Sequence, residues 1–63
     1  MENRAKSIYR IRYSTPEKPD GIFYTGAENA VSARLNFLMQ TDHPRESIRT
    51  IDVRVGNEWR RMI

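Results

Sequence analysis

One helix-forming segment, with a pair of strand-like segments on each side of it, is the feature that most restricts the fold of this chain. From about Gly26 to Gln40, apolar residues recur with helical spacing, whereas the flanking segments alternate between apolar and polar residues. A single helix can cover only one face of a sheet. The order therefore predicts a small α+β domain of ββαββ type, in which an antiparallel sheet carries one helix on one face.

The four strand-like segments are predicted to form two hairpins. Residues 8–13 are joined to residues 22–24 by a loop that contains two prolines and ends in Asp-Gly, a strong turn signal. Residues 48–55 are joined to residues 58–63 by a Gly-Asn dipeptide, which is typical of a two-residue hairpin turn. The sheet should therefore contain four strands, two on each side of the helix in chain order.

The Gly-Asn turn at positions 56–57 also predicts the register of the second hairpin. Counting outwards from the turn, Arg54 lies opposite Trp59 and Asp52 lies opposite Arg61. Directly opposed residues share one face of a sheet. Since the valines and isoleucine that alternate with Asp52 and Arg54 should face the helix, all four of these polar or aromatic residues should face away from it.

The helix is predicted to begin with a capping box, in which Thr25 and Glu28 each accept a hydrogen bond from the other's backbone N–H. It should end before Pro44, because the residue that precedes a proline avoids the α region. The apolar stripe expected to pack on the sheet consists of Ala27, Ala30, Val31, Leu35 and Leu38, with Phe37 and Met39 beside it.

The chain has 63 residues and no cysteine, so neither disulfides nor thiolate zinc sites can stabilise it. A core of this size supplies roughly 3–5 kcal/mol of net stability, which leaves little to hold a strained catalytic site. His43 is the only histidine and has no second metal ligand at a matching spacing. We therefore predict one domain over residues 1–63, with residues 1–5 disordered, that is not an enzyme and binds neither metal nor cofactor.

Membrane association is not expected from this sequence. No apolar run approaches the ~18 residues of a membrane span. The first residues are not followed by an apolar segment of signal-peptide length. Because small secreted domains usually need disulfides, the lack of cysteine favours a cytoplasmic location.

The basic residues are mostly arginine, and several of them should gather on the face of the sheet away from the helix. Lys+Arg is 11 against 8 for Asp+Glu, which gives a net charge of +3 and a pI near 9.8. Arginine offers planar, forked donors that suit phosphate and carboxylate groups. The candidate partner-binding residues on this face are Arg10, Arg12, Arg54, Trp59 and Arg61.

Three interpretations of this face remain open from the sequence. Arg54 could lie on Trp59 as a cation–π pair while Asp52 bridges Arg61, which would only stabilise an exposed sheet. The face could instead bind nucleic acid, with a ring stacked on bases and guanidinium groups against phosphates, or it could bind an acidic protein surface. The register places Arg60 on the helix side, unless a bulge reverses the strand and buries Trp59.

We favour a small, basic, non-catalytic binding or regulatory protein with nucleic acid as its partner. Exposed strand edges would also allow a homodimer. In pattern, residues 8–13, 22–24, 27–40 and 51–55 resemble small bacteriophage-encoded host-takeover proteins of the type that inhibits bacterial RNA polymerase. That resemblance implies an alternative, a phage- or mobile-element-type protein that inhibits or modulates a host protein. This chain is basic, however, where that type relies partly on acidic contacts.

Overall fold

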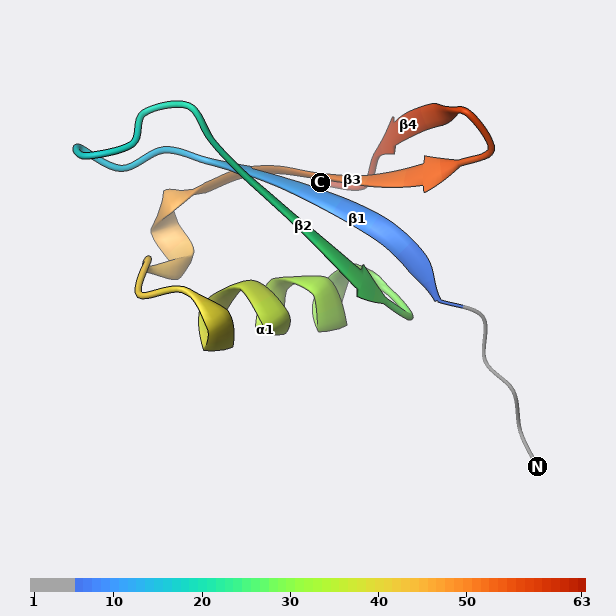
Figure 1. The fold of residues 1–63 in the computed structure, drawn as a ribbon, viewed down its shortest axis with the longest axis horizontal. Coiled ribbons are helices and arrows are strands. Elements are labelled where there is room, and N and C mark those ends of the chain that lie inside the picture. Colours follow the sequence, from blue (N-terminus) through green and yellow to red (C-terminus); the bar gives the residue numbers. More distant parts are fainter. Residues whose placement is uncertain (1–5) are drawn as a thin grey trace.

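Within residues 6–63, which the computed structural model describes, four strands form one antiparallel sheet with a helix against one face (Figure 1). The predicted ββαββ architecture is confirmed, whereas the predicted disorder of residues 1–5 lies outside the described residues. The strands follow the order β2-β1-β3-β4 across the sheet. The elements are β1 (Ser7–Tyr13), β2 (Gly21–Ala27), α1 (Ala30–Gln40), the 3₁₀ helix η1 (Arg45–Ser47), β3 (Ile48–Val55) and β4 (Glu58–Arg61).

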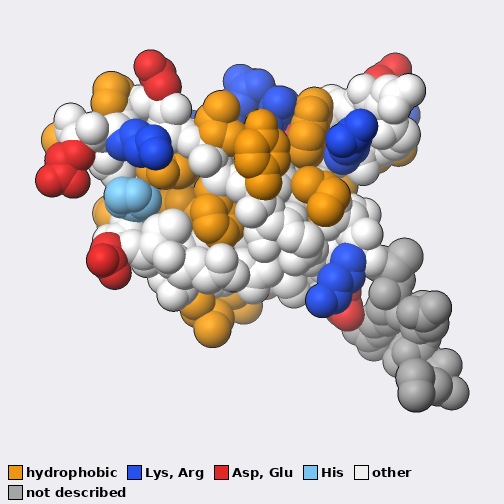
Figure 2. Space-filling view, in the orientation of Figure 1, with side chains coloured by type: hydrophobic (Ala, Val, Ile, Leu, Met, Phe, Trp, Pro, Cys, Tyr) orange, Lys and Arg blue, Asp and Glu red, His pale blue; other side chains and the backbone are white. Residues whose placement is uncertain are grey.

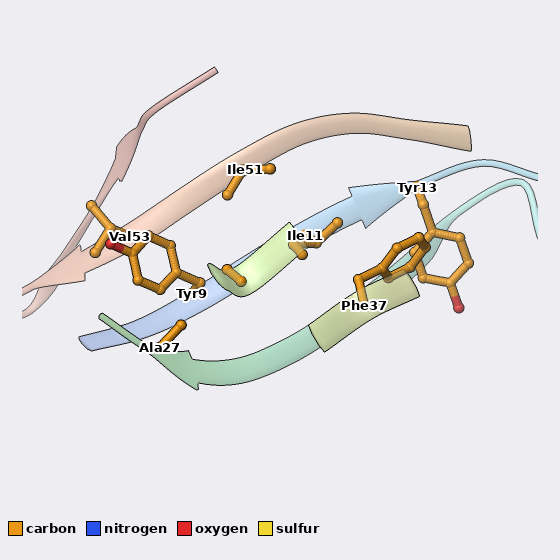
Figure 3. Close-up of a cluster of buried hydrophobic side chains, with 8 residues drawn as sticks. Tyr9, Ile11, Tyr13, Ala27, Phe37, Ile51 and Val53 are labelled. Carbon is orange, nitrogen blue, oxygen red and sulfur yellow. The ribbon is translucent and has the colours of Figure 1, made fainter. Parts of the chain in front are cut away.

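The core lies between α1 and the inner face, the face of the sheet that α1 covers. Alternate residues of β1 point into it, as the sequence predicts, and Ile11 is fully buried. The Phe37 ring of α1 lies 5.1 Å from the Tyr13 ring and 5.5 Å from the Phe23 ring. Figure 3 shows Phe37 and Tyr13 with the other buried side chains between the helix and the strands. The buried set consists of Tyr9, Ile11, Tyr13, Ala27, Ala33, Phe37, Ile51 and Val53.

The predicted start of the helix is wrong, because β2 continues to Ala27 and α1 begins only at Ala30. The pairing of β2 with β1 includes the last residue of β2, since Ala27 lies opposite Ser7, the first residue of β1. This ladder includes Thr25, which a capping box would need as the cap residue. Asn29 caps the helix instead, since its side-chain oxygen accepts a 2.8 Å hydrogen bond from the Ser32 backbone N–H.

The predicted apolar stripe of α1 is only partly correct, because Ala30 and Leu38 pack against the core as expected, whereas Val31 and Leu35 do not. Ala33 and Phe37 are the buried residues of the helix, whereas Val31, Leu35 and Met39 are 58%, 49% and 80% exposed. Hydrogen bonds from Asn36 to β2 help to fix the rotation of α1 about its axis. The side-chain amide of Asn36 donates to the Thr25 hydroxyl at 3.0 Å and to the Gly26 carbonyl at 3.2 Å, which ties that side of the helix to β2.

A β-bulge interrupts the pairing of β1 with β3. Arg12 lies opposite Thr50, but the next residue of β1, Tyr13, lies opposite Ile48. Arg49 is therefore the extra residue of β3. Bulges of this kind bend a strand and redirect its side chains.

The second hairpin has the register that the Gly-Asn turn predicts, with Arg54 opposite Trp59 and Asp52 opposite Arg61. Gly56 has φ +63°, a left-handed conformation that glycine adopts without a steric penalty. The strand is not reversed, so Arg60 lies opposite Val53 and is exposed. In Figure 1, β4 rises from the sheet on the side opposite to α1.

Candidate functional site

The five predicted site residues share the outer face, which is the face of the sheet away from α1. Their positions follow from the register. One row across the sheet runs from Tyr24 through Arg10 and Asp52 to Arg61. Neighbouring rows place the other predicted residues, Arg12, Arg54 and Trp59, on the same side. Figure 2 shows Lys and Arg side chains along the upper side of the molecule, beyond the sheet.

Arg10 is held by a carboxylate and is not a free cation. Its Nε and Nη2 atoms donate to Asp52 Oδ2 at 3.2 and 3.0 Å. The side chains of Arg10 and Asp52 are only 17% and 8% exposed. The predicted bridge from Asp52 to Arg61 is therefore wrong, because the carboxylate turns along the row toward β1 rather than toward β4.

Trp59 lies over Arg10 and not over Arg54. The Arg10 guanidinium carbon is 4.4 Å from the centre of the indole ring, and the Tyr24 ring is 6.0 Å from it at a tilt of 47°. The predicted cation–π pair between Arg54 and Trp59 is therefore wrong. Because β4 curls over the outer face, the indole ring reaches across β3 toward β1 and β2, away from the residue directly opposite it.

Three of the predicted arginines remain accessible on this face. The side chain of Arg12 is 53% exposed, and its Nε lies 3.9 Å from Asp52 Oδ2. Arg54 is exposed, and its Nε donates to the Gly56 carbonyl at 3.1 Å. Arg61 is exposed as well. The outer face thus combines one neutralised arginine, two neighbouring rings and three accessible guanidinium groups.

Three further residues belong to this face although sequence reasoning did not assign them to the site. Tyr24 is 58% exposed and lies directly opposite Arg10. It could have been found by extending the register of the first hairpin, since alternation puts it on the side of Arg10. Thr50 lies opposite Arg12 and could have been found in the same way, since it alternates with Asp52. Arg49 is brought beside these two residues by the bulge, for which the sequence holds no signal.

No group of three or more His, Cys, Asp or Glu side chains within residues 6–63 could hold a metal ion. Among those same residues, neither length nor apolar character equips a helix to cross a membrane.

Comparison with protein-family models found no match to this sequence, and comparisons with curated proteins and with solved structures found none either.

Proposed function

We propose that this chain is a non-catalytic nucleic-acid-binding protein that holds a single strand on its outer face. The observation that carries the proposal is the neighbouring pair of rings, Trp59 and Tyr24, on a face that also presents accessible arginines. Single-strand binders combine aromatic side chains, on which bases stack, with a basic surface that follows the phosphates.

The contacts around Arg10 support this arrangement by fixing the position of Trp59. Arg10 is bound by Asp52 beneath and lies against the indole ring above, so it holds the ring over the sheet. Its charge is offset by the carboxylate. Arg12, Arg54 and Arg61 then supply the positive charge toward the partner, and they surround the two rings on three different strands.

The test is the affinity of the protein for a short single-stranded oligonucleotide at low salt, measured by fluorescence anisotropy. Tyr24→Ala should weaken binding about tenfold or more, because base–aromatic stacking is worth ~1–3 kcal/mol per base. Tyr24 is exposed, so this substitution should leave the fold intact. Arg61→Gln should reduce the slope of log affinity against log salt by about 0.7, the loss expected for one phosphate contact.

Arg45→Gln is the matched control, because Arg45 is an exposed arginine of η1 outside the outer face. It lowers the net charge by the same amount as Arg61→Gln but should change the affinity much less. Absence of binding to both DNA and RNA single strands at low salt would overturn the proposal. If Arg45→Gln and Arg61→Gln lowered the affinity equally, the oligonucleotide would be attracted by the net charge of the protein and not by the outer face.

A second candidate function, a regulator that binds a host protein, is favoured by the exposed stripe of α1. Val31, Leu35 and Met39 follow one another at helical spacing on the side of α1 that the sheet leaves uncovered. In Figure 2 hydrophobic side chains protrude from the surface below α1. Stripes of this kind dock into apolar grooves of partner proteins. The resemblance to phage host-takeover proteins agrees with this candidate.

The second candidate predicts a one-to-one complex with a bacterial protein, isolated after nuclease treatment and stable at moderate salt. Leu35→Ser should abolish that complex without unfolding the chain, because Leu35 is half exposed. Gln40→Ser, a polar exchange on the same helix, is the control. A complex that survives Leu35→Ser would contradict docking through α1.

A further inference from the structure

A cavity of about 340 Å³ opens beside Arg12, where the first hairpin loop meets the bulge of β3. Arg12 and Thr50, which line it, are each two residues along their strand from the row that contains Arg10 and Asp52. This separation is roughly 7 Å. Its wall includes Arg12, Pro19, Asp20, Ile22, Arg49 and Thr50. The cavity is thus separate from the two rings but continuous with the face that carries them.

The bulge explains why both Arg12 and Arg49 line this cavity. In a regular ladder, Arg49 and Thr50 would point to opposite faces of the sheet. Because Arg49 is the extra residue of β3, both of them line the same cavity as Arg12, which lies opposite Thr50. Two arginines within one small cavity form a concentrated positive site, and forked guanidinium groups bind phosphate oxygens in pairs.

The Thr50 hydroxyl adds a second, independent sign of a ligand. Among residues 6–63, it is the buried side-chain polar atom that has no hydrogen-bond partner. Leaving a buried polar group unpaired is costly, and such groups are frequent at binding sites. Thr50 also lines the cavity, so an oxygen bound there is a candidate acceptor for this hydroxyl.

We propose that this cavity binds the phosphate group of a nucleotide, an inference that rests on the proposed function and deepens it. Arg12 and Arg49 hold the phosphate oxygens, and the Thr50 hydroxyl donates to one of them. The apolar wall, with Ile22 and Pro19, receives the sugar or the base. Asp20 would repel a bare anion but accepts a hydrogen bond from a hydroxyl or amino group of a nucleoside.

The first experiment follows the backbone amide signals of the protein by NMR during titration with adenosine 5′-monophosphate and, separately, with adenosine. The monophosphate should shift the signals of Arg12, Arg49 and Thr50, whereas adenosine should not. Arg49→Gln should weaken monophosphate binding about tenfold, the loss expected for a hydrogen bond to a charged group. Arg45→Gln should leave it unchanged.

Thr50→Val keeps the shape of the side chain and removes the hydroxyl. It should weaken monophosphate binding several-fold while leaving the protein at least as stable, because the unpaired buried hydroxyl disappears. Thermal unfolding of the same variant measures the stability. The proposal would be overturned if the monophosphate shifted the amide signals of residues outside the cavity instead. It would also be overturned if the monophosphate caused equal shifts in the Arg49→Gln variant.

A comparison of two oligonucleotides shows whether the cavity binds a terminal phosphate or a phosphate within the strand. If a 5′-phosphorylated strand binds tighter than the unphosphorylated strand, and Arg49→Gln abolishes the difference, the cavity takes a terminal phosphate. If Arg49→Gln weakens both strands equally, it takes a phosphate within the chain. Both results support the site.

These experiments distinguish failure of the cavity site from failure of the proposed function. Strand binding that needs Tyr24 but is unaffected by Arg49→Gln and Thr50→Val would overturn the cavity site and leave the proposed function standing. Monophosphate binding at Arg49 without any oligonucleotide binding would support the cavity and overturn the proposed function.

Discussion

At the scale of single residues, Arg10 is fixed by neighbours from two other strands. Asp52 of β3 accepts two hydrogen bonds from it, and the Trp59 ring of β4 covers its guanidinium group. A charge in such a sheltered position is tolerated only when it is paired. Arg10 therefore serves the structure of the outer face, while the more exposed arginines around it are the ones that can meet a partner.

Arg10→Ala should lower the free energy of unfolding by about 2 kcal/mol, because the buried Asp52 loses both hydrogen bonds and keeps only the longer 3.9 Å contact with Arg12. Urea unfolding followed by circular dichroism measures this loss. Arg54→Ala, on the exposed part of the same face, should change the stability by no more than about 0.5 kcal/mol. Equal effects of the two substitutions would contradict the pairing of Arg10 with Asp52.

Phe37 and Leu35 of α1 provide a second contrast between neighbouring residues. Phe37 is fully buried, so Phe37→Ala should cost about 3–5 kcal/mol, as much as the net stability of a domain of this size. This variant should be unfolded at room temperature by circular dichroism. Leu35→Ala, at a half-exposed position, should remain folded with a melting temperature close to that of the parent chain. A larger loss of stability for Leu35→Ala than for Phe37→Ala would mean that α1 turns a different side toward the sheet.

At the scale of elements, the strands were more predictable than the helix. Alternation in β1 and the glycine turn after Val55 are local signals, and they correctly give the inward residues of β1 and the register of the second hairpin. The rotation of α1 depends instead on Asn36 reaching β2, a contact between residues far apart in the chain. The bulge at Arg49 has the same non-local origin.

The start of α1 gives a test at this scale. Asn29→Ala should destabilise the protein by about 1 kcal/mol, because the Ser32 N–H loses its acceptor. Thr25→Val should cost less than Asn29→Ala, since valine suits the strand β2 and the Asn36 amide, which loses the Thr25 hydroxyl, keeps its hydrogen bond to the Gly26 carbonyl. Chemical denaturation of the two variants measures both effects. A larger loss for Thr25→Val, measured in a chain that already carries Asn36→Ala and so lacks the Asn36 hydrogen bond, would indicate that the helix is capped at Thr25.

At the scale of the whole molecule, the placement of the helix decides which surfaces are available to partners. α1 lies mainly over β2 and β1, and it leaves the outer face to the rings and arginines. Chain order and the alternation of residues could predict that face and its five residues. The partners of Trp59 could not be predicted, because they depend on how far β4 curls over the sheet. The cavity beside Arg49 likewise required the folded chain.

The fluorescence of Trp59 during titration with a single-stranded oligonucleotide tests the outer face most directly. This residue is the only tryptophan of the chain, so its emission reports on the proposed site alone. Stacking of a base should quench the emission to a saturating value, and the midpoint should move to higher oligonucleotide concentration as salt is added. Emission that stays unchanged at low salt, while a labelled oligonucleotide binds the protein, would contradict a site at Trp59.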